Sequence, residues 1–197
     1  MTVIGFYGSS KIEGWRMKLS QYLNDFTIVD LVSAEGEQAD IALVWAPPAG
    51  QLTKMPNLRG IIMQGQGVDY MMADTTVPRD VPLVRLVDAD MSSALSHWAI
   101  LAALDFWRDA PHYRACQASA NWQPIAQRRA SGAKVGIMGV GAIGSLMAQR
   151  FAGLGFDVRG WARSPRQIAD VMIFAGDEGL APFLDGLDIL VSVLPLT

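Results

Sequence analysis

The chain has 197 residues, and 51% of them are hydrophobic, which is enough to bury the core of one large domain or of two small ones. Charged residues make up only 18% and the formal net charge is −3, so nothing suggests a nucleic-acid-binding surface or an electrostatic membrane anchor. Any anionic ligand must therefore be held by local groups.

Short apolar runs in the first part of the chain alternate with segments of helical pattern, which is typical of α/β proteins with mostly parallel strands. Five of these runs are predicted strands: Val3–Gly8, Phe26–Val32, Asp40–Ala46, Leu58–Gly65 and Val81–Leu86. Together they predict a first α/β unit that precedes the glycine-rich part of the sequence.

A predicted helix, from about Ser92 to Arg108, follows this unit. Serines at its start can serve as N-cap, its apolar residues recur at helical spacing, and the sequence Asp-Ala-Pro ends it. A polar stretch comes next, and a second α/β unit begins at Lys134. We therefore expect two domains, residues 1–90 and 91–197, with the boundary near Ala89 to Ser92.

The second unit opens with a predicted buried strand, Val135 to Met138, and a G-x-G-x-x-G turn. The three glycines have separate physical tasks. Gly139 permits the tight turn, and Gly141 lets the backbone approach a pyrophosphate. Gly144 lets the following helix come close to the strand.

The backbone amides of Ala142 and Ile143 begin that helix, so their N–H groups and the positive end of the helix dipole face the predicted phosphates. A glycine triplet alone is weak evidence, because tight turns use glycine for structural reasons. Strand, triplet, amphipathic helix and second strand within about thirty residues are much more specific. The segment therefore predicts a dinucleotide-binding site.

The residue that decides between the two nicotinamide cofactors is predicted at the end of the second strand. An acid that binds the adenosine ribose is expected roughly 20 residues after the glycines. Ala162 stands 23 residues after Gly139, so the acid is missing. Arg163 can therefore pair with a 2′-phosphate, and Ser164 can donate a hydrogen bond to it. This favours NADP over NAD.

Two alternatives stay open at this strand end. Arg163 and Arg166 could be solvated loop charges with no ligand. Trp161 could simply pack within the strand, or its ring could lie near the adenine of the cofactor.

The chain resembles the D-isomer-specific 2-hydroxyacid dehydrogenases, most of all their glyoxylate/hydroxypyruvate reductase branch. Counterparts occur in the same order along essentially the whole chain, in ALVWAPP, LRGIIMQGQGVDYM, VPLVRLVDADMSSALSHWAILAAL, NWQPIA, KVGIMGVGAIGS, GWARS and DILVSVLPLT. The resemblance implies two Rossmann-like or flavodoxin-like α/β domains with parallel sheets. It also implies that the second, NAD(P)-binding domain is incomplete in this chain. The β-hydroxyacid dehydrogenases and imine reductases begin with the glycine motif, whereas 133 residues precede Lys134 here.

The resemblance gives a role to the loop Gly65-Gln66-Gly67. It matches the segment whose backbone amides hold the substrate carboxylate, and consecutive amides in a glycine loop can bind an anion without a positive side chain. From the residues alone, an ordinary turn remains the alternative.

Three further positions are placed by the resemblance. Trp45 matches an aromatic position near the substrate pocket, with plain core packing as the alternative. Leu194 and Pro195 belong to the strand-end segment that lines the cofactor.

The reaction that the resemblance implies is hydride transfer from NADPH to the carbonyl carbon of a small 2-oxo acid, which gives the D-2-hydroxy acid. Relatives use an arginine to bind the substrate, and a histidine paired with a glutamate as acid and base. The resemblance places all three beyond Thr197, so we expect no catalytic residue in this chain. We expect either a fragment of a longer enzyme or a truncated product without normal catalysis. His97 is expected to be structural, and His112 to be a loop or surface residue.

The expected partners are the small-molecule substrate and, in the full-length protein, a second copy of the chain. The segment ANWQPIAQ resembles the arm through which relatives form two-fold dimers, and its Trp122 is either an interface anchor or ordinary core.

The single cysteine, Cys116, and the absence of a signal peptide or long apolar run predict a cytoplasmic protein. No metal site is predicted. A non-catalytic nucleotide-binding fragment or interaction module is the alternative function.

Overall fold

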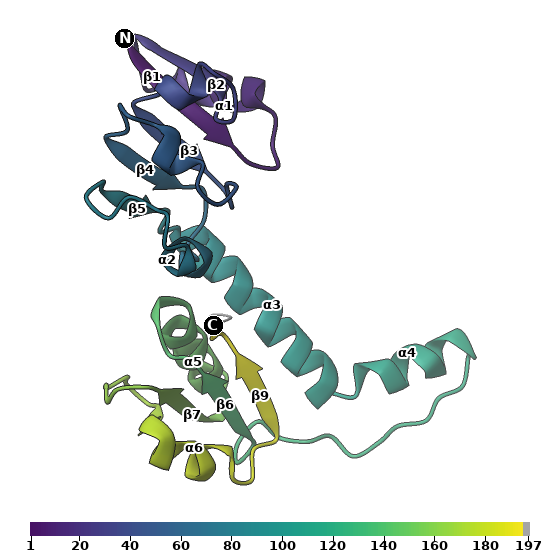
Figure 1. The fold of residues 1–197 in the computed structure, drawn as a ribbon. Coiled ribbons are helices and arrows are strands. Elements are labelled where there is room, and N and C mark those ends of the chain that lie inside the picture. The colour runs from purple at the N-terminus through teal and green to yellow at the C-terminus, as the bar shows by residue number, and fades with distance from the viewer. Residues whose placement is uncertain (195–197) are drawn as a thin grey trace. The chain divides into compact units, whose positions relative to one another are not determined.

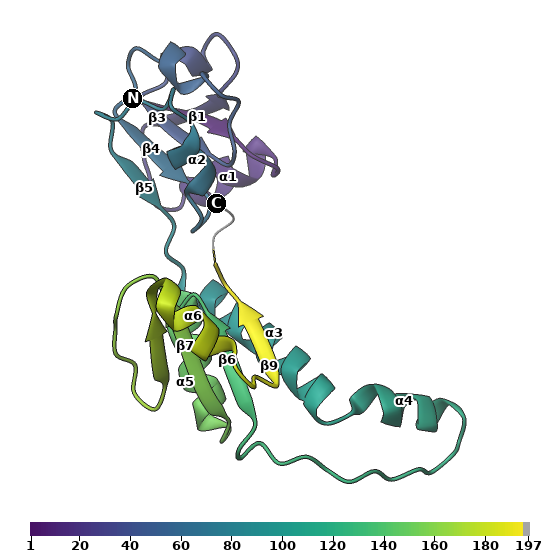
Figure 2. The same ribbon diagram turned by 60° about the horizontal axis from the view of Figure 1, so that its bottom comes forward.

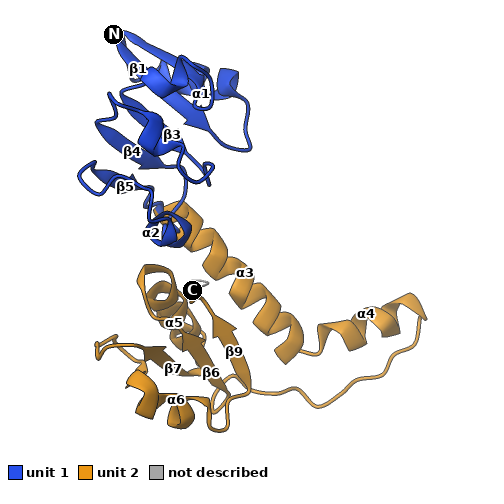
Figure 3. Ribbon diagram, viewed as in Figure 1, with its two compact units in different colours: residues 1–88, 195–197 blue, residues 89–194 orange. Residues whose placement is uncertain are grey.

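A computed structural model describes residues 1–194 of the chain (Figure 1). These residues divide into two compact units, Met1–Asp88 and Ala89–Leu194 (Figure 3). Each unit contains its own parallel β-sheet. Among the described residues, no helix is both long enough and apolar enough to cross a membrane.

The first unit is built around a five-stranded parallel sheet in the order β2-β1-β3-β4-β5. Its elements are β1 (Thr2–Tyr7), α1 (Ile12–Leu19), β2 (Phe26–Asp30), η1 (Gly36–Gln38), β3 (Ile41–Val44), η2 (Leu52–Lys54), β4 (Gly60–Met63), α2 (Asp69–Ala73) and β5 (Leu83–Arg85). This strand order is the flavodoxin-like one, in which ligands bind beyond the carboxyl ends of the strands. All five predicted strands are present, most of them shorter than predicted.

Both faces of this first sheet carry apolar side chains, because successive residues of a strand point to opposite sides. In β1, Ile4 and Phe6 are buried in the cluster that also contains Trp15 of α1. Val3 and Tyr7 pack instead against the cluster on the other face. A parallel sheet covered on both faces explains why these strands read as nearly continuous apolar runs.

The second unit contains a four-stranded parallel sheet in the order β8-β7-β6-β9 (Figure 2). Its elements are α3 (Ala89–Trp107), α4 (Ala110–Ala118), β6 (Lys134–Met138), α5 (Ala142–Gly153), β7 (Asp157–Ala162), β8 (Met172–Ala175), α6 (Gly176–Leu184) and β9 (Ile189–Ser192). Numbered within the unit, the order 3-2-1-4 is that of the first four strands of the doubly wound dinucleotide-binding sheet.

Successive residues of β6 point to opposite faces of the sheet, and a different helix packs on each face. Val135 and Ile137 are fully buried in one cluster with Phe151 of α5. Gly136, between them, faces the other side, where a β-carbon would lie 3.0 Å from the ring of Phe183 in α6. Both helices therefore pack directly on the strand that leads into the glycine turn.

Helix α3 is attached to α5 by polar contacts as well as by apolar packing. The guanidinium of Arg150 donates to the backbone carbonyl of Ser93 at 3.1 Å and to its hydroxyl at 2.8 Å. This contact fixes the long helix against the helix that begins at the glycine turn.

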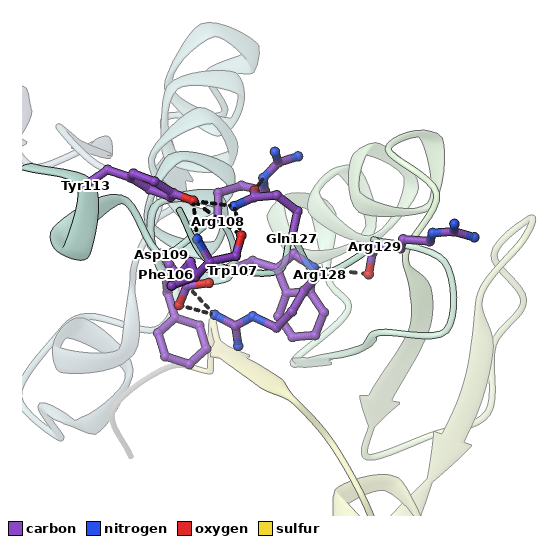
Figure 4. Close-up of polar contacts among 9 residues, drawn as sticks. Phe106, Trp107, Arg108, Asp109, Tyr113, Gln127, Arg128 and Arg129 are labelled. Atoms are coloured by element: carbon purple, nitrogen blue, oxygen red, sulfur yellow. Dashed lines mark hydrogen bonds and ion pairs between the residues drawn. The ribbon is translucent and has the colours of Figure 1, made fainter. Parts of the chain in front are cut away.

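The corner after α3 is a second polar cluster (Figure 4). Asp109 takes a left-handed φ of +53°, and α4 begins directly after it, a helix that the sequence analysis did not predict. Residues 121–129, which are neither helix nor strand, return along this corner. Arg128 anchors them, because it donates to the Phe106 carbonyl at 3.0 Å and to the Asp109 carboxylate at 2.8 Å.

Candidate functional site

The glycine turn joins β6 to α5 as the sequence predicts. Gly139 has a φ of +96°, which only glycine adopts readily. Its amide and that of Val140 both donate to the carbonyl of Trp161, at 2.9 and 3.3 Å, which ties the turn to the end of β7. The first helical residue after the turn is Ala142.

Gly144 allows α5 to approach the turn more closely than any other residue would. A β-carbon there would lie 2.1 Å from the carbonyl oxygen of Gly139 and 3.0 Å from the side chain of Val193. Leu194 lies on another side of the turn, since a β-carbon on Gly139 would be 3.0 Å from its side chain. Pro195, the last predicted cofactor residue, lies outside the described residues.

Gly141 differs from the other two glycines of the motif. It occupies the N-cap of α5 with an ordinary φ of −74°, and a β-carbon on it would meet no protein atom within 4 Å. The fold therefore does not require glycine at this position. The open space lies beside the first turn of α5, where the amides of Ala142 and Ile143 have no acceptor within the helix.

The end of β7 lies at the same edge of the sheet as the glycine turn, because Trp161 is in register with Met138. Ala162 is buried at the strand end, in the position expected for a ribose-binding acid. Arg163 and Ser164 come next and are exposed. The structure thus brings the predicted phosphate-binding arginine to the edge that carries the turn.

Two neighbouring side chains are held by the protein itself. Arg166 is exposed, but its guanidinium donates to the carbonyl of Val140 inside the glycine turn. That carbonyl also accepts the hydroxyl of Ser145 at 3.0 Å. The indole N–H of Trp161 donates to the Gly176 carbonyl at 2.9 Å, so its ring is fixed toward the start of α6.

In the first unit, the predicted substrate loop follows β4 and is held by its carbonyl groups. The amide of Leu86 donates to the Gly65 carbonyl at 3.2 Å, and Arg85 donates to the Gln66 carbonyl at 3.3 Å. The side chain of Gln66 donates in turn to the carbonyl of Asp88 at 2.9 Å. Gly67 completes the loop before α2.

Trp45 lies against this loop from the end of β3. A β-carbon on Gly65 would be 2.2 Å from the six-membered ring of Trp45, so the indole rests directly on the glycine. Trp45 is nevertheless 47% exposed, which disagrees with plain core packing. Tyr70, which no sequence motif identified, has its ring centroid 6.5 Å from that of Trp45.

The remaining candidates of the sequence analysis lie elsewhere. His97 is exposed on α3. His112 lies on α4 rather than in a loop, half-buried, with its Nε2 atom 2.8 Å from the Gln123 carbonyl. Within residues 1–194, no group of three or more histidine, cysteine or acidic side chains is placed to hold a metal ion.

The second unit has the features of a defined class of protein. A buried parallel strand, a glycine turn with one left-handed and one sterically required glycine, and a helix beginning at the turn define a Rossmann-type dinucleotide-binding domain. Residues 100–197 match the family described as "D-isomer specific 2-hydroxyacid dehydrogenase, NAD binding domain". The chain belongs to the D-isomer specific 2-hydroxyacid dehydrogenase family.

Curated relatives resemble the chain over its full length. It is 35% identical to glyoxylate/hydroxypyruvate reductase A of Serratia proteamaculans and 33% identical to that of Yersinia enterocolitica. Each match covers 100% of this chain and 64% of the relative. The chain therefore spans less than two thirds of the length of these proteins.

Solved structures also match the whole of this chain and only part of their own length. A D-isomer specific 2-hydroxyacid dehydrogenase from Xanthobacter autotrophicus, in complex with NADPH and MES, is 34% identical with a TM-score of 0.86. An NADPH-dependent glyoxylate/hydroxypyruvate reductase from Sinorhizobium meliloti, in complex with NADP and sulfate, is 31% identical with a TM-score of 0.86. The matches cover 100% of this chain, and 64% and 63% of those chains.

Proposed function

We propose that this chain forms the cofactor-binding region and part of the substrate-binding region of an NADPH-dependent reductase. The substrate is a small 2-oxo acid of the glyoxylate or hydroxypyruvate type, and the product is the D-2-hydroxy acid. The observation that carries the proposal is the open space at Gly141, beside the positive end of α5, where the fold itself does not require a glycine. A pyrophosphate needs such a space, because it must approach the backbone closely.

In this proposal the amides of Ala142 and Ile143 bind the pyrophosphate. Leu194, with Pro195 after it, lines the cofactor beyond the turn. Trp161 borders the adenosine end, where its fixed ring would limit the space for the adenine.

Arg163 and Ser164 bind the 2′-phosphate of the cofactor. Both are exposed at the end of β7, and Ala162 places no carboxylate there to repel a phosphate. Two of the related structures were solved with NADPH or NADP, which supports NADPH as the preferred cofactor.

In the first unit, the loop Gly65-Gln66-Gly67 binds the substrate carboxylate through backbone amides, and Trp45 forms an adjoining wall. The nicotinamide, when bound, supplies the hydride. The chain's own residues bind and orient the two reactants. No catalytic residue is proposed within this chain.

We also propose that the full-length protein is a cytoplasmic homodimer. Trp122, at the start of the anchored segment 121–129, is 79% exposed, which favours an interface anchor over ordinary core. The single cysteine, Cys116, agrees with a reducing compartment.

The decisive experiment compares Gly141→Ala with Gly153→Ala. Gly153 lies at the other end of the same helix, and a β-carbon added there would also meet no protein atom within 4 Å. Gly141→Ala should weaken NADPH binding about 10-fold or more, because overpacking costs about 1–3 kcal/mol. Its free energy of unfolding should change by less than about 1 kcal/mol, since alanine is a poorer N-cap than glycine but reduces the conformational entropy of the unfolded chain. Unchanged NADPH affinity in Gly141→Ala would contradict the proposed cofactor site.

Turnover separates the reductase from the alternative of a non-catalytic nucleotide-binding module. We expect loss of NADPH absorbance with glyoxylate or hydroxypyruvate when the full-length protein is tested. NADPH binding without turnover of either acid by that protein would favour the module.

A further inference from the structure

We infer that Tyr70 is a positioning residue that holds the Trp45 indole against the substrate loop, and that this aromatic pair limits the size of the substituent at C3 of the 2-oxo acid. The inference about the substituent rests on the proposed function. The inference about the position of Trp45 rests on the first unit alone.

Tyr70 lies on α2, directly after the substrate loop, and contacts the residues that surround Trp45. Its hydroxyl accepts the backbone N–H of Ala46 at 3.1 Å and lies 3.9 Å from the sulfur of Met63. Its ring is tilted by 50° to the Trp45 indole, at a centroid distance of 6.5 Å. A single side chain therefore contacts both the ring of Trp45 and the backbone immediately after it.

The backbone that Tyr70 holds is strained. Ala46 has a φ of +46°, a conformation that residues other than glycine rarely adopt. Such a conformation persists only where the surroundings enforce it, and the Tyr70 hydroxyl provides a contact that does so. Because Ala46 is exposed, water can replace this hydrogen bond, so its loss should alter the direction of Trp45 more than the stability of the fold.

The aromatic pair is a surface wall rather than core. Trp45 is 47% exposed and Tyr70 is 37% exposed, although both are large rings that fixed contacts hold in place. The indole already touches Gly65, the first residue of the loop proposed to bind the carboxylate. In a 2-oxo acid, C3 is only two bonds from the carboxylate carbon, so a substituent on C3 must extend close to this wall.

The first part of the test measures the position of Trp45 without any ligand. The chain is labelled with 5-fluorotryptophan, and Trp45→Phe assigns the ¹⁹F signal of this residue. Tyr70→Phe, which removes only the hydroxyl, should shift the Trp45 signal, and Tyr70→Leu should shift and broaden it. Tyr22→Phe is the matched control, because Tyr22 is 82% exposed. Urea midpoints of all variants establish that they fold.

The second part measures selectivity by titration calorimetry in saturating NADP⁺, with oxamate as the small probe and phenylpyruvate as the bulky one. The full-length wild-type protein, used because the substrate-binding arginine is expected outside this chain, should prefer oxamate. Tyr70→Phe should reduce this preference about 3- to 10-fold, the factor that corresponds to one net hydrogen bond. Tyr70→Leu should reduce it at least as much, and Tyr22→Phe should leave it unchanged.

The outcomes distinguish the inference from the proposed function. An unaltered Trp45 signal in both Tyr70 variants would overturn the positioning role. A shifted signal with an unaltered preference would overturn the size limit. Binding of NADP⁺ but of neither acid by the wild type would reject the 2-oxo-acid site and the size limit together. Failure to bind NADP⁺ would reject the proposed cofactor, while the ligand-free ¹⁹F result for Tyr70 would still stand.

Discussion

Gly144 and Gly139 are so close that a β-carbon on Gly144 would lie 2.1 Å from the carbonyl oxygen of Gly139. The contacted atom belongs to the backbone, so it cannot move aside as a flexible side chain can. We predict that Gly144→Ala lowers the free energy of unfolding by about 1–3 kcal/mol, the usual cost of overpacking. The displaced turn should also lose NADPH affinity.

Gly153→Ala is again the control, because it makes the same substitution in α5 without a clash. It should leave stability unchanged or raise it by up to about 1 kcal/mol, since alanine favours helix more than glycine does. Urea unfolding measures the free energy of unfolding of both variants. Equal stabilities for Gly144→Ala and Gly153→Ala would show that the turn can relax around a methyl group.

Arg163 and Arg166 are predicted to affect cofactor binding differently. Arg163→Ala should weaken NADPH binding by about 1–3 kcal/mol and leave NADH binding nearly unchanged, because only NADPH carries the 2′-phosphate. Arg166→Ala should weaken both to a similar extent, because Arg166 contacts the Val140 carbonyl of the shared pyrophosphate turn. Fluorescence titration with NADPH and with NADH measures the affinity of each variant for the two cofactors. Equal losses in Arg163→Ala would contradict its role in cofactor choice.

The sequence predicts the glycine turn well because the determinants of the turn are local. Gly139 requires a left-handed φ, and Gly144 requires a close approach to the residue five positions earlier, so both constraints fall within one short motif. Tyr70 and Arg166 could not be found in this way. Their partners, Ala46 and Val140, are 24 and 26 residues away along the chain, and only folding brings them together.

Some elements of the fold could be predicted from the local sequence pattern, and others could not. Most of the predicted strands are apolar runs, and β7 (Asp157–Ala162) ends at Ala162, where the sequence places the end of the second strand. Helix α4 was missed although its start has a recognisable sequence signal, namely Pro111 in its first turn. Strand β8, Met172–Ala175, has only four residues, too few for a periodic pattern to identify it.

Arg128 is predicted to control the order of the segment that carries Trp122. Its guanidinium lies 4.7 Å from the centroid of the Trp107 ring and donates to the Asp109 carboxylate at 2.8 Å. Arg128→Ala should therefore increase amide hydrogen exchange across residues 121–129. Arg128→Lys should restore little protection, because an ammonium lacks the planar donor geometry of the guanidinium.

Arg129→Ala is the matched control for this change. The side chain of Arg129 points away from the cluster in Figure 4, and only its backbone carbonyl takes part, by accepting the Trp107 indole N–H at 3.2 Å. Exchange across residues 121–129 should therefore remain at the wild-type level in Arg129→Ala. If Arg128→Ala also leaves exchange unchanged, the anchoring role is wrong.

The Asp105–Arg114 pair between α3 and α4 is predicted to titrate as an exposed ion pair. Arg114 donates to both carboxylate oxygens, at 2.6 and 3.0 Å, and these hydrogen bonds hold the pKa of Asp105 below its usual 3.8. Because the folded-state pKa is lowered, the pair stabilises the fold above the unfolded-state pKa, and this contribution is lost as pH falls through the folded-state pKa. Arg114→Gln should therefore raise the pKa of Asp105, as measured by carboxyl ¹³C chemical shifts, and reduce the stability difference between neutral and strongly acidic pH. Arg108→Gln, which removes a guanidinium that binds Gln127 instead, should leave the Asp105 titration unchanged, and an equal rise in both variants would contradict the assignment to Arg114.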